Sequence, residues 1–250
     1  MTMSPDSRNQ PSGEVITAFD GAIVVRVVTH PDRLFAFDTT FILDHPRLLA
    51  LADERPPLHF HPYQDEFVEV LEGELIVEVE GTEHCLTPQD GEFTVQAWAS
   101  HRLYPPRKTT QEDNDRVSVP SAAPKRTRFI LSADETPQAF KLDLVFFRNW
   151  YAYQDSIVLQ KASPDMIQIM CTFDAGGSYL SFAPWIPFNK AIARCVGIVA
   201  GRWIGGLVGY RPFYSQWTPS KDWETARDKM NASLFYRSWY RGCEAGQEAM

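Results

Sequence analysis

Three histidines and one glutamate within residues 58–101 constrain this chain more than any other feature. Residues 58–73 read L-H-F-H-P-Y-Q-D-E-F-V-E-V-L-E-G, and residues 90–101 read D-G-E-F-T-V-Q-A-W-A-S-H. His59 and His61 are two positions apart, so on an extended strand both side chains leave the same face. The two imidazoles are therefore predicted to point into one space.

The glutamate of this set is predicted to point inward as well. Glu66 shares its strand face with Val68 and Val70, and a carboxylate in an apolar interior is costly unless a cation or hydrogen bonds compensate it. Taken singly, each of the four residues is more often an ordinary polar residue than a metal ligand. Taken together, they suit a borderline divalent metal and leave two octahedral positions open. The predicted ligands are His59, His61, Glu66 and His101.

Most of the remaining pattern before residue 149 is that of β-strands. Residues 23–28 form a β-branched run, residues 74–80 alternate between apolar and acidic side chains, and Asp90-Gly91 is a hairpin signal. Short strands punctuated by Gly or Pro at roughly ten-residue spacing predict an antiparallel barrel or sandwich. We place this domain at residues 15–148, after a disordered N-terminus at 1–14. Residues 107–128, which are polar and contain two prolines, are predicted to form an insertion that serves as a lid or as an inert loop.

From residue 149 to residue 250 we predict an α-helical C-terminal extension. Expected helices cover Tyr151–Lys161 and Met166–Phe173, and another begins at the N-cap Thr218 and runs to about Tyr240. The run Leu142–Phe147 just before the extension is assigned to a strand. Glycine recurs at intervals of four in the apolar stretch 190–210, at Gly197, Gly201, Gly205 and Gly209.

The stretch 190–210 supports two interpretations. Its glycines would line one side of a helix and allow close contact with the barrel or with a second subunit. A membrane-spanning helix is disfavoured because Arg194 and Arg202 lie inside it, at a cost of about 2.5–3.5 kcal/mol each at mid-bilayer. Contact with a membrane surface stays open.

Composition limits the partners and the location of the chain. A net charge of −8 and a pI near 5.3, with no basic run, argue against nucleic acid. The four cysteines are scattered without a CxxC pair, and the polar N-terminus lacks a secretory apolar region. We therefore expect a cytoplasmic protein with reduced thiols, with peripheral membrane association through 190–210 as the alternative.

The spacing H-x-H-x4-E-x6-G, with His59, His61, Glu66 and Gly73, resembles the first motif of the cupin superfamily. His101 maps onto the last metal-ligand histidine of the second motif. The resemblance implies a mainly β fold, a cupin antiparallel β-barrel of the jelly-roll type, followed here by the α-helical C-terminal extension. Trp98 stands where the second motif usually has glycine, which changes the wall beside the site.

The whole chain also resembles the cupin-domain proteins of fungal secondary-metabolite gene clusters. This resemblance implies a metal-dependent oxidoreductase or dioxygenase that acts on a polyketide-like or aromatic intermediate. Two alternatives stay open, namely a non-oxidative isomerase, lyase or cyclase of the same kind of pathway, and a non-catalytic ligand-binding cupin. The implied cofactor is one divalent metal ion (Fe, Mn or Zn), and the implied partners are a small-molecule natural-product intermediate and a second copy of the chain in a homodimer.

Aromatic residues next to the predicted ligands are candidates for substrate contact. These are Phe60, Trp98 and Tyr104. Tyr104 is also the candidate general acid, because a phenol beside a metal can donate a proton. Ordinary packing in the barrel is at least as good an explanation for Phe60. Tyr63, Gln64 and Asp65 are expected to support the ligands from the turn before Glu66.

Overall fold

A computed structural model describes residues 13–106 and 125–236 of the 250-residue chain. The described residues form two compact units that interleave along the sequence. The first unit takes in residues 13–57, 66–95, 101–106 and 125–132, and the second takes in 58–65, 96–100 and 133–236. The predicted N-terminal segment 1–14 lies outside the described residues except for residues 13 and 14, and Cys243 lies outside them. The predicted insertion 107–128 also lies outside them up to residue 124, and its predicted end was wrong, because β10 (Arg126–Ala133) already begins at Arg126.

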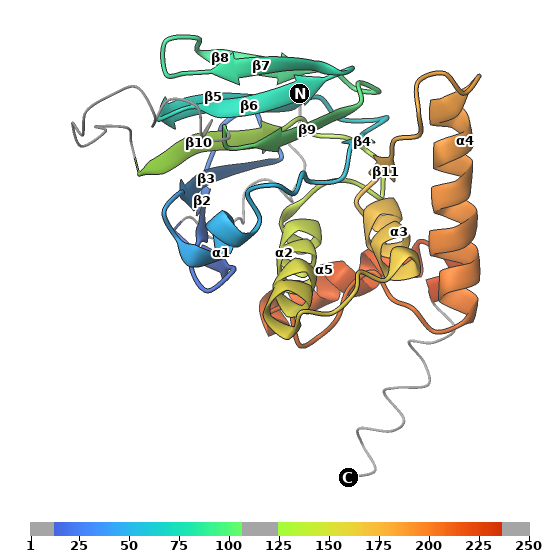
Figure 1. Ribbon diagram of the computed structural model, residues 1–250. Helices are drawn as coiled ribbons and strands as arrows, with labels where there is room; N and C mark the ends of the chain where they lie inside the picture. The colour runs from blue at the N-terminus through green and yellow to red at the C-terminus, as the bar shows by residue number, and fades with distance from the viewer. Residues whose placement is uncertain (1–12, 107–124, 237–250) are drawn as a thin grey trace, which may run out of the picture. The chain divides into compact units, whose positions relative to one another are not determined.

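One antiparallel sheet has six strands (Figure 1). In spatial order these are β1 (Val15–Ala18), β2 (Ile23–Val28), β3 (Phe35–Ile42), β10 (Arg126–Ala133), β5 (Glu66–Glu72) and β8 (Glu92–Val95). β2 shows why the sequence forms strands here, because Ile23, Val25 and Val27 are buried while Arg26 between them is exposed. β-Branched residues with a two-residue repeat favour such a half-buried strand.

A second antiparallel sheet has five strands in the order β11 (Tyr179–Leu180), β4 (His59–Phe60), β9 (His101–Tyr104), β6 (Leu75–Val79) and β7 (Thr82–Leu86). In β6 the side chains of Leu75 and Val77 are fully buried, as the alternation of this segment predicts. The mainly β character of the N-terminal part and the two antiparallel sheets are thus confirmed, and they agree with a cupin-like fold. The closure of the sheets into a barrel stays a prediction.

The first unit has a core of large apolar side chains. Phe35 and Phe37 stack with their ring centroids 4.7 Å apart, and Phe41 meets Phe129 edge to face. Full burial of a side chain of this size contributes about 1.5–3 kcal/mol to stability. The unit also contains the short helix α1 (Pro46–Ala50).

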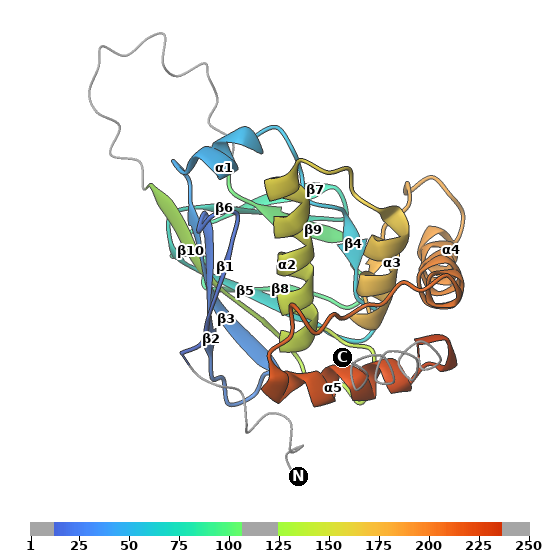
Figure 2. The same ribbon diagram turned by 90° about the horizontal axis from the view of Figure 1, so that it is seen from below.

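The described part of the C-terminal extension is mostly helical, as predicted. Its helical elements are α2 (Leu144–Gln160), α3 (Met166–Ala175), α4 (Asn189–Val196), the π-helical η2 (Gly197–Gly205) and α5 (Ser220–Asn231). Figure 2 shows them from a second direction. None of the helices in the described ranges combines the length and the apolar character that crossing a bilayer requires.

The assignment of Leu142–Phe147 to a strand was wrong, because these residues lead into α2. Asp143 is the N-cap of that helix, and its side chain accepts a hydrogen bond from the Phe146 amide at 2.9 Å. A short apolar run without alternation does not distinguish a buried strand from a buried helix. The carboxylate three residues before Phe146 was the local signal for a helix.

The predicted start of the last helix was also wrong. Thr218 does not cap α5, which begins at Ser220 after Pro219 without a side-chain cap. The Thr218 hydroxyl instead accepts a hydrogen bond from the Asn149 side-chain amide at 2.9 Å. A contact with α2 therefore uses the oxygen that a capping bond would need. The predicted end of this helix near Tyr240 lies outside the described residues.

Candidate metal centre

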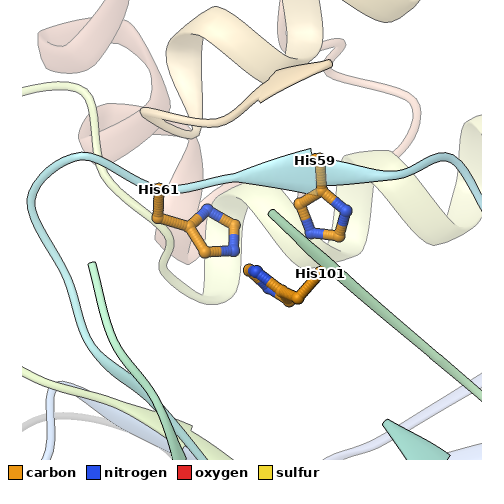
Figure 3. A group of neighbouring side chains, drawn as sticks. All are labelled: His59, His61 and His101. Atoms are coloured by element: carbon orange, nitrogen blue, oxygen red, sulfur yellow. The ribbon is translucent and has the colours of Figure 1, made fainter. Parts of the chain in front are cut away.

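His59, His61 and His101 lie close together (Figure 3). Each contributes one ring nitrogen, and these nitrogens all lie within 4.8 Å of one another. His61 and His101 are buried, and His59 is partly buried. Figure 3 shows His59 and His61 leaving the same side of their chain segment towards His101. The same-face prediction for His59 and His61 is confirmed, and their role as metal ligands stays a prediction.

β4 holds the first two histidines by burying the residue between them. Phe60 is fully buried and packs with Tyr179 and Ala193 in an apolar cluster of the second unit. Because side chains alternate along a strand, Phe60 points away from the face that carries His59 and His61. Phe60 therefore anchors β4, and its predicted role in contacting substrate is not supported by this placement.

Trp98 has a left-handed backbone conformation, with φ of +70°. Glycine adopts this conformation without strain, which explains why this position suits a glycine. The Trp98 amide donates a hydrogen bond to the His61 carbonyl at 2.8 Å, and its ring stacks on Phe60 at 5.6 Å. Trp98 thus supports the chain around His61 from behind, rather than lining the face on which the histidines lie.

Glu66 is the first residue of β5 and is buried. Its Oε2 atom lies 3.7 Å from Nε2 of His101. The cluster of mutually close ligand atoms consists of the three histidines and does not extend to Glu66. The carboxylate is therefore brought beside the cluster, and its coordination of a metal stays a prediction.

The turn between His61 and Glu66 is fixed by long-range hydrogen bonds. The side-chain amide of Gln64 accepts from the Leu142 amide at 2.7 Å and donates to the carbonyls of Leu142 and Asp134. Asp65 accepts from the Ala97 amide at 2.7 Å. The sequence predicted supporting roles for Gln64 and Asp65, but not their partners, because these lie about 30 to 80 positions away with no local signal.

Tyr63 and Phe173 are two further aromatic residues near the histidine cluster. Tyr63 accepts a short hydrogen bond from Arg194 of α4, whose guanidinium also lies over the tyrosine ring. Phe173 of α3 places its ring centroid 5.8 Å from that of His59. Sequence reasoning missed Phe173, because its position follows from how α3 packs within the second unit and not from any motif. It provides an aromatic surface next to the cluster.

Tyr104 does not fit the predicted role of general acid or substrate contact. It lies three residues after His101 on β9, so the two side chains occupy opposite faces of the strand. Its hydroxyl hydrogen-bonds to Glu83 at 2.9 Å and to Glu78 at 3.3 Å. Burial and the hydrogen bond to Glu83 raise the pKa of Tyr104 to about 12. Through these hydrogen bonds, Tyr104 belongs to a network of charged side chains in the first unit.

Curated relatives at substantial identity come from fungi. An oxidoreductase of Arthrobotrys oligospora is 39% identical over 227 residues, which cover 90% of this chain and 84% of that protein. The probable oxidoreductase yanE of Aspergillus niger is 39% identical over 229 residues, covering 90% and 83%. The chain belongs to this family of fungal oxidoreductases. Epoxidase atD of Aspergillus terreus is a further relative, 36% identical over 234 residues that cover 89% of this chain and 68% of the enzyme.

No protein-family model matches the chain. Solved structures similar to part of it include KdgF from a Halomonas species, with 20% identity, a TM-score of 0.29, and coverage of 46% of this chain and 82% of KdgF. FeII HppE has 13% identity, a TM-score of 0.32, and coverage of 53% and 60%. These likenesses are too low to bear on the activity. Membership in the oxidoreductase family rests on the curated relatives alone.

Proposed function

We propose that this fungal-type oxidoreductase is metal-dependent and that His59, His61 and His101 hold one divalent metal ion. The observation that carries the proposal is the approach of three imidazole nitrogens to within 4.8 Å of one another at a largely buried position. Buried imidazoles that converge in this way match the ligand type of zinc, iron and related metals. We further propose Glu66 as the fourth ligand, since its carboxylate lies beside His101.

The donor set fits such an ion. Three neutral imidazoles and one carboxylate leave the complex with a divalent metal at a net charge of +1, which a buried site tolerates better than a full double charge. When bound, the metal would supply Lewis acidity and, if it is iron or manganese, redox chemistry. Membership in an oxidoreductase family favours iron or manganese, because zinc has no redox chemistry.

The chain's own residues serve chiefly to hold the site in one geometry. Phe60 fixes β4 from its buried face, and Gln64 ties the turn between His61 and Glu66 to the Leu142 backbone. Rigid support of this kind limits the movement of the ligands and so preorganises the site. Phe173, whose ring lies against His59, offers an apolar surface that would exclude water and accept an aromatic or polyketide-like substrate.

The substrate class is proposed from the family together with the site. We expect a polyketide-like or aromatic intermediate of secondary metabolism, as for the fungal cluster proteins that the sequence resembles. The non-oxidative and non-catalytic alternatives lose support, because the curated relatives are oxidoreductases and an epoxidase.

The metal proposal is tested by elemental analysis of the purified protein. Wild-type protein should carry about one iron or manganese per chain, and His61→Ala should lose most of it. His84→Ala, which changes a histidine of β7 outside the cluster, is the matched control and should keep the metal. A wild-type protein without stoichiometric metal, or metal retained in His61→Ala, would contradict the proposed site.

The oxidative chemistry is tested separately. We expect dioxygen to be the oxidant in the turnover of aromatic or polyketide-like intermediates, so activity measured aerobically should disappear under strict anaerobiosis. Tightly bound zinc together with full anaerobic turnover would show that the chain uses the metal only as a Lewis acid. That result would overturn the oxidative proposal while leaving the metal site intact.

A further inference from the structure

The helix formed by α4 and η2 has one face packed within the second unit and an opposite apolar face that is largely exposed among the residues that the structure describes. Figure 1 shows the two elements as one long helix beside α3. An added methyl group at Gly201 would lie 2.5 Å from the backbone of Met170, and one at Gly197 would lie 2.7 Å from the Tyr179 ring. The glycines are thus the contact face of this helix within the second unit.

The opposite face exposes large apolar side chains. They recur three or four positions apart along the helix, at Ile192, Val196, Val199, Trp203 and Leu207. One side of the Trp203 ring stacks on Phe235, and the side chain stays 45% exposed. Leu207 is 62% exposed, and Phe188, immediately before α4, is 85% exposed. An apolar stripe of this length on a helix surface normally marks a contact with something outside the molecule.

The charge of this region indicates what that contact is. The sequence has no Asp or Glu between Asp174 and Asp222, although the whole chain carries a net charge of −8. The cations in this interval are Lys190, Arg194, Arg202, Arg211 and Lys221. Asp174, at the edge of the interval, pairs with Arg202 at 2.6 and 2.8 Å, and the interval as a whole keeps an excess of positive charge.

We propose that this stripe docks on the surface of an anionic lipid bilayer. The apolar side chains would enter the boundary between headgroups and acyl chains, with the helix lying in the membrane plane. Exposed aromatic side chains such as Trp185 and Phe188 suit that boundary. A second copy of this chain fits less well, because two such faces would oppose their cations without any carboxylate from the same interval.

The proposal is independent of the metal site. It agrees with the exclusion of a spanning helix, since a helix lying in the surface does not need the length of a bilayer. It places the chain at a membrane surface, where an apolar intermediate would also concentrate. The surface is defined by the exposed apolar residues of α4 and η2 together with Phe188, Leu207 and Val208, and we refer to it as the apolar stripe.

Sedimentation of the full chain with vesicles tests the proposal. Vesicles of phosphatidylcholine mixed with phosphatidylserine should bind the protein, and vesicles of phosphatidylcholine alone should bind it about tenfold more weakly. The double variant Leu207→Ser/Val208→Ser should weaken binding to the mixed vesicles by about tenfold or more. Lys190→Glu should weaken it in a salt-sensitive way.

The matched control is Leu49→Ser, which makes the same exchange at an exposed leucine of α1 and should bind as the wild type does. Circular dichroism and thermal unfolding verify that each variant is folded. Failure of the wild type to bind mixed vesicles would overturn the proposal, as would equal binding by the double variant. A homodimer in analytical ultracentrifugation that the double variant dissociates would assign the apolar stripe to self-association instead.

Discussion

Phe60 links packing to chemistry at the scale of a single residue. Its ring is fully buried against Tyr179 and Trp98, while its two neighbours in sequence present their imidazoles on the opposite side of the chain. The position of the histidines is therefore set by an apolar contact on the opposite side of the strand. A change at Phe60 should affect stability and metal binding together.

We predict that Phe60→Ala lowers the free energy of unfolding by about 3–5 kcal/mol, because it removes a buried aromatic ring and leaves a cavity. Urea denaturation followed by circular dichroism measures this loss. Phe188→Ala is the matched control, since its ring is exposed, and it should change stability by less than about 0.5 kcal/mol. Equal stability of the two variants would show that Phe60 does not anchor β4.

Glu78 is the centre of a charged network in the first unit. Its carboxylate accepts hydrogen bonds from Arg102 at 2.8 Å, from Arg55 at 3.1 Å and from the Tyr104 hydroxyl. The hydrogen bond from Arg102 outweighs burial and holds the pKa of Glu78 below its usual value of 4.5. A lowered pKa in the folded state stabilises the fold above the pKa of the unfolded state, and this stability is lost as the pH falls through the folded pKa.

We therefore predict that the wild type loses part of its stability as the pH falls below about 5, and that Glu78→Gln flattens this loss. At pH 7 the variant should be less stable by about 1–3 kcal/mol, since its partners lose a charged acceptor. Urea midpoints across this pH range measure both effects. Glu69→Gln, on the exposed face of β5, is the control and should keep the acid dependence of the wild type.

The packing of η2 against α3 depends on the small size of its glycine residues. Its buried glycines bring the helix against α3 so closely that a side chain at Gly201 would meet the Met170 backbone. We predict that Gly201→Ala destabilises the second unit by about 1–3 kcal/mol through overpacking, although alanine normally favours a helix. Thermal unfolding measures this, with Val199→Ala on the exposed face as a control of small effect. A gain in stability from Gly201→Ala would contradict the close approach of the two helices.

The elements also show which parts of the fold the sequence can reveal. The two-residue repeat around His59 and His61 predicted their common face. The glycine spacing predicted close backbone contact along one side of a helix, but that side packs mainly against α3 rather than against the barrel or a second subunit, and Gly209 lies beyond the helix with φ of +99°. The assignment failed at Leu142–Phe147, where an apolar run without alternation starts α2. The two segments differ in what their patterns can indicate. A periodic pattern indicates which face of an element is buried, whereas a uniformly apolar run indicates only that the segment is buried.

Contacts between distant segments explain the rest of what the sequence did not reveal. Gln64 pairs with the Leu142 backbone across 78 positions, and Phe173 reaches the His59 ring from a helix more than a hundred residues later. Neither contact can be predicted from the residues close to it in the sequence. Tyr104 shows the opposite error, because closeness in sequence to His101 suggested a shared site while strand alternation separates the two side chains.

For the molecule as a whole, the proposed metal is expected both to stabilise the native state and to be required for activity. The proposed ligands are His59, His61 and His101, with Glu66 beside His101. An ion that binds the native state but not the unfolded chain stabilises the native state according to its concentration and affinity. Each unit has its own apolar core, so the fold does not depend on the metal in the way that a small zinc domain does.

We therefore predict that chelation leaves the chain folded and inactive rather than unfolded. Removal of the metal from a protein that is saturated about a hundredfold above its Kd costs about 2.7 kcal/mol, which lowers the Tm by roughly 5–10 °C for a chain of this size. Differential scanning calorimetry with and without EDTA measures the shift, and adding back iron or manganese should restore both Tm and activity. His61→Ala should have the lower Tm already and show no further change with EDTA. Global unfolding of the wild type on chelation would mean that the metal is structural, and an unchanged Tm would mean that the histidines hold no metal.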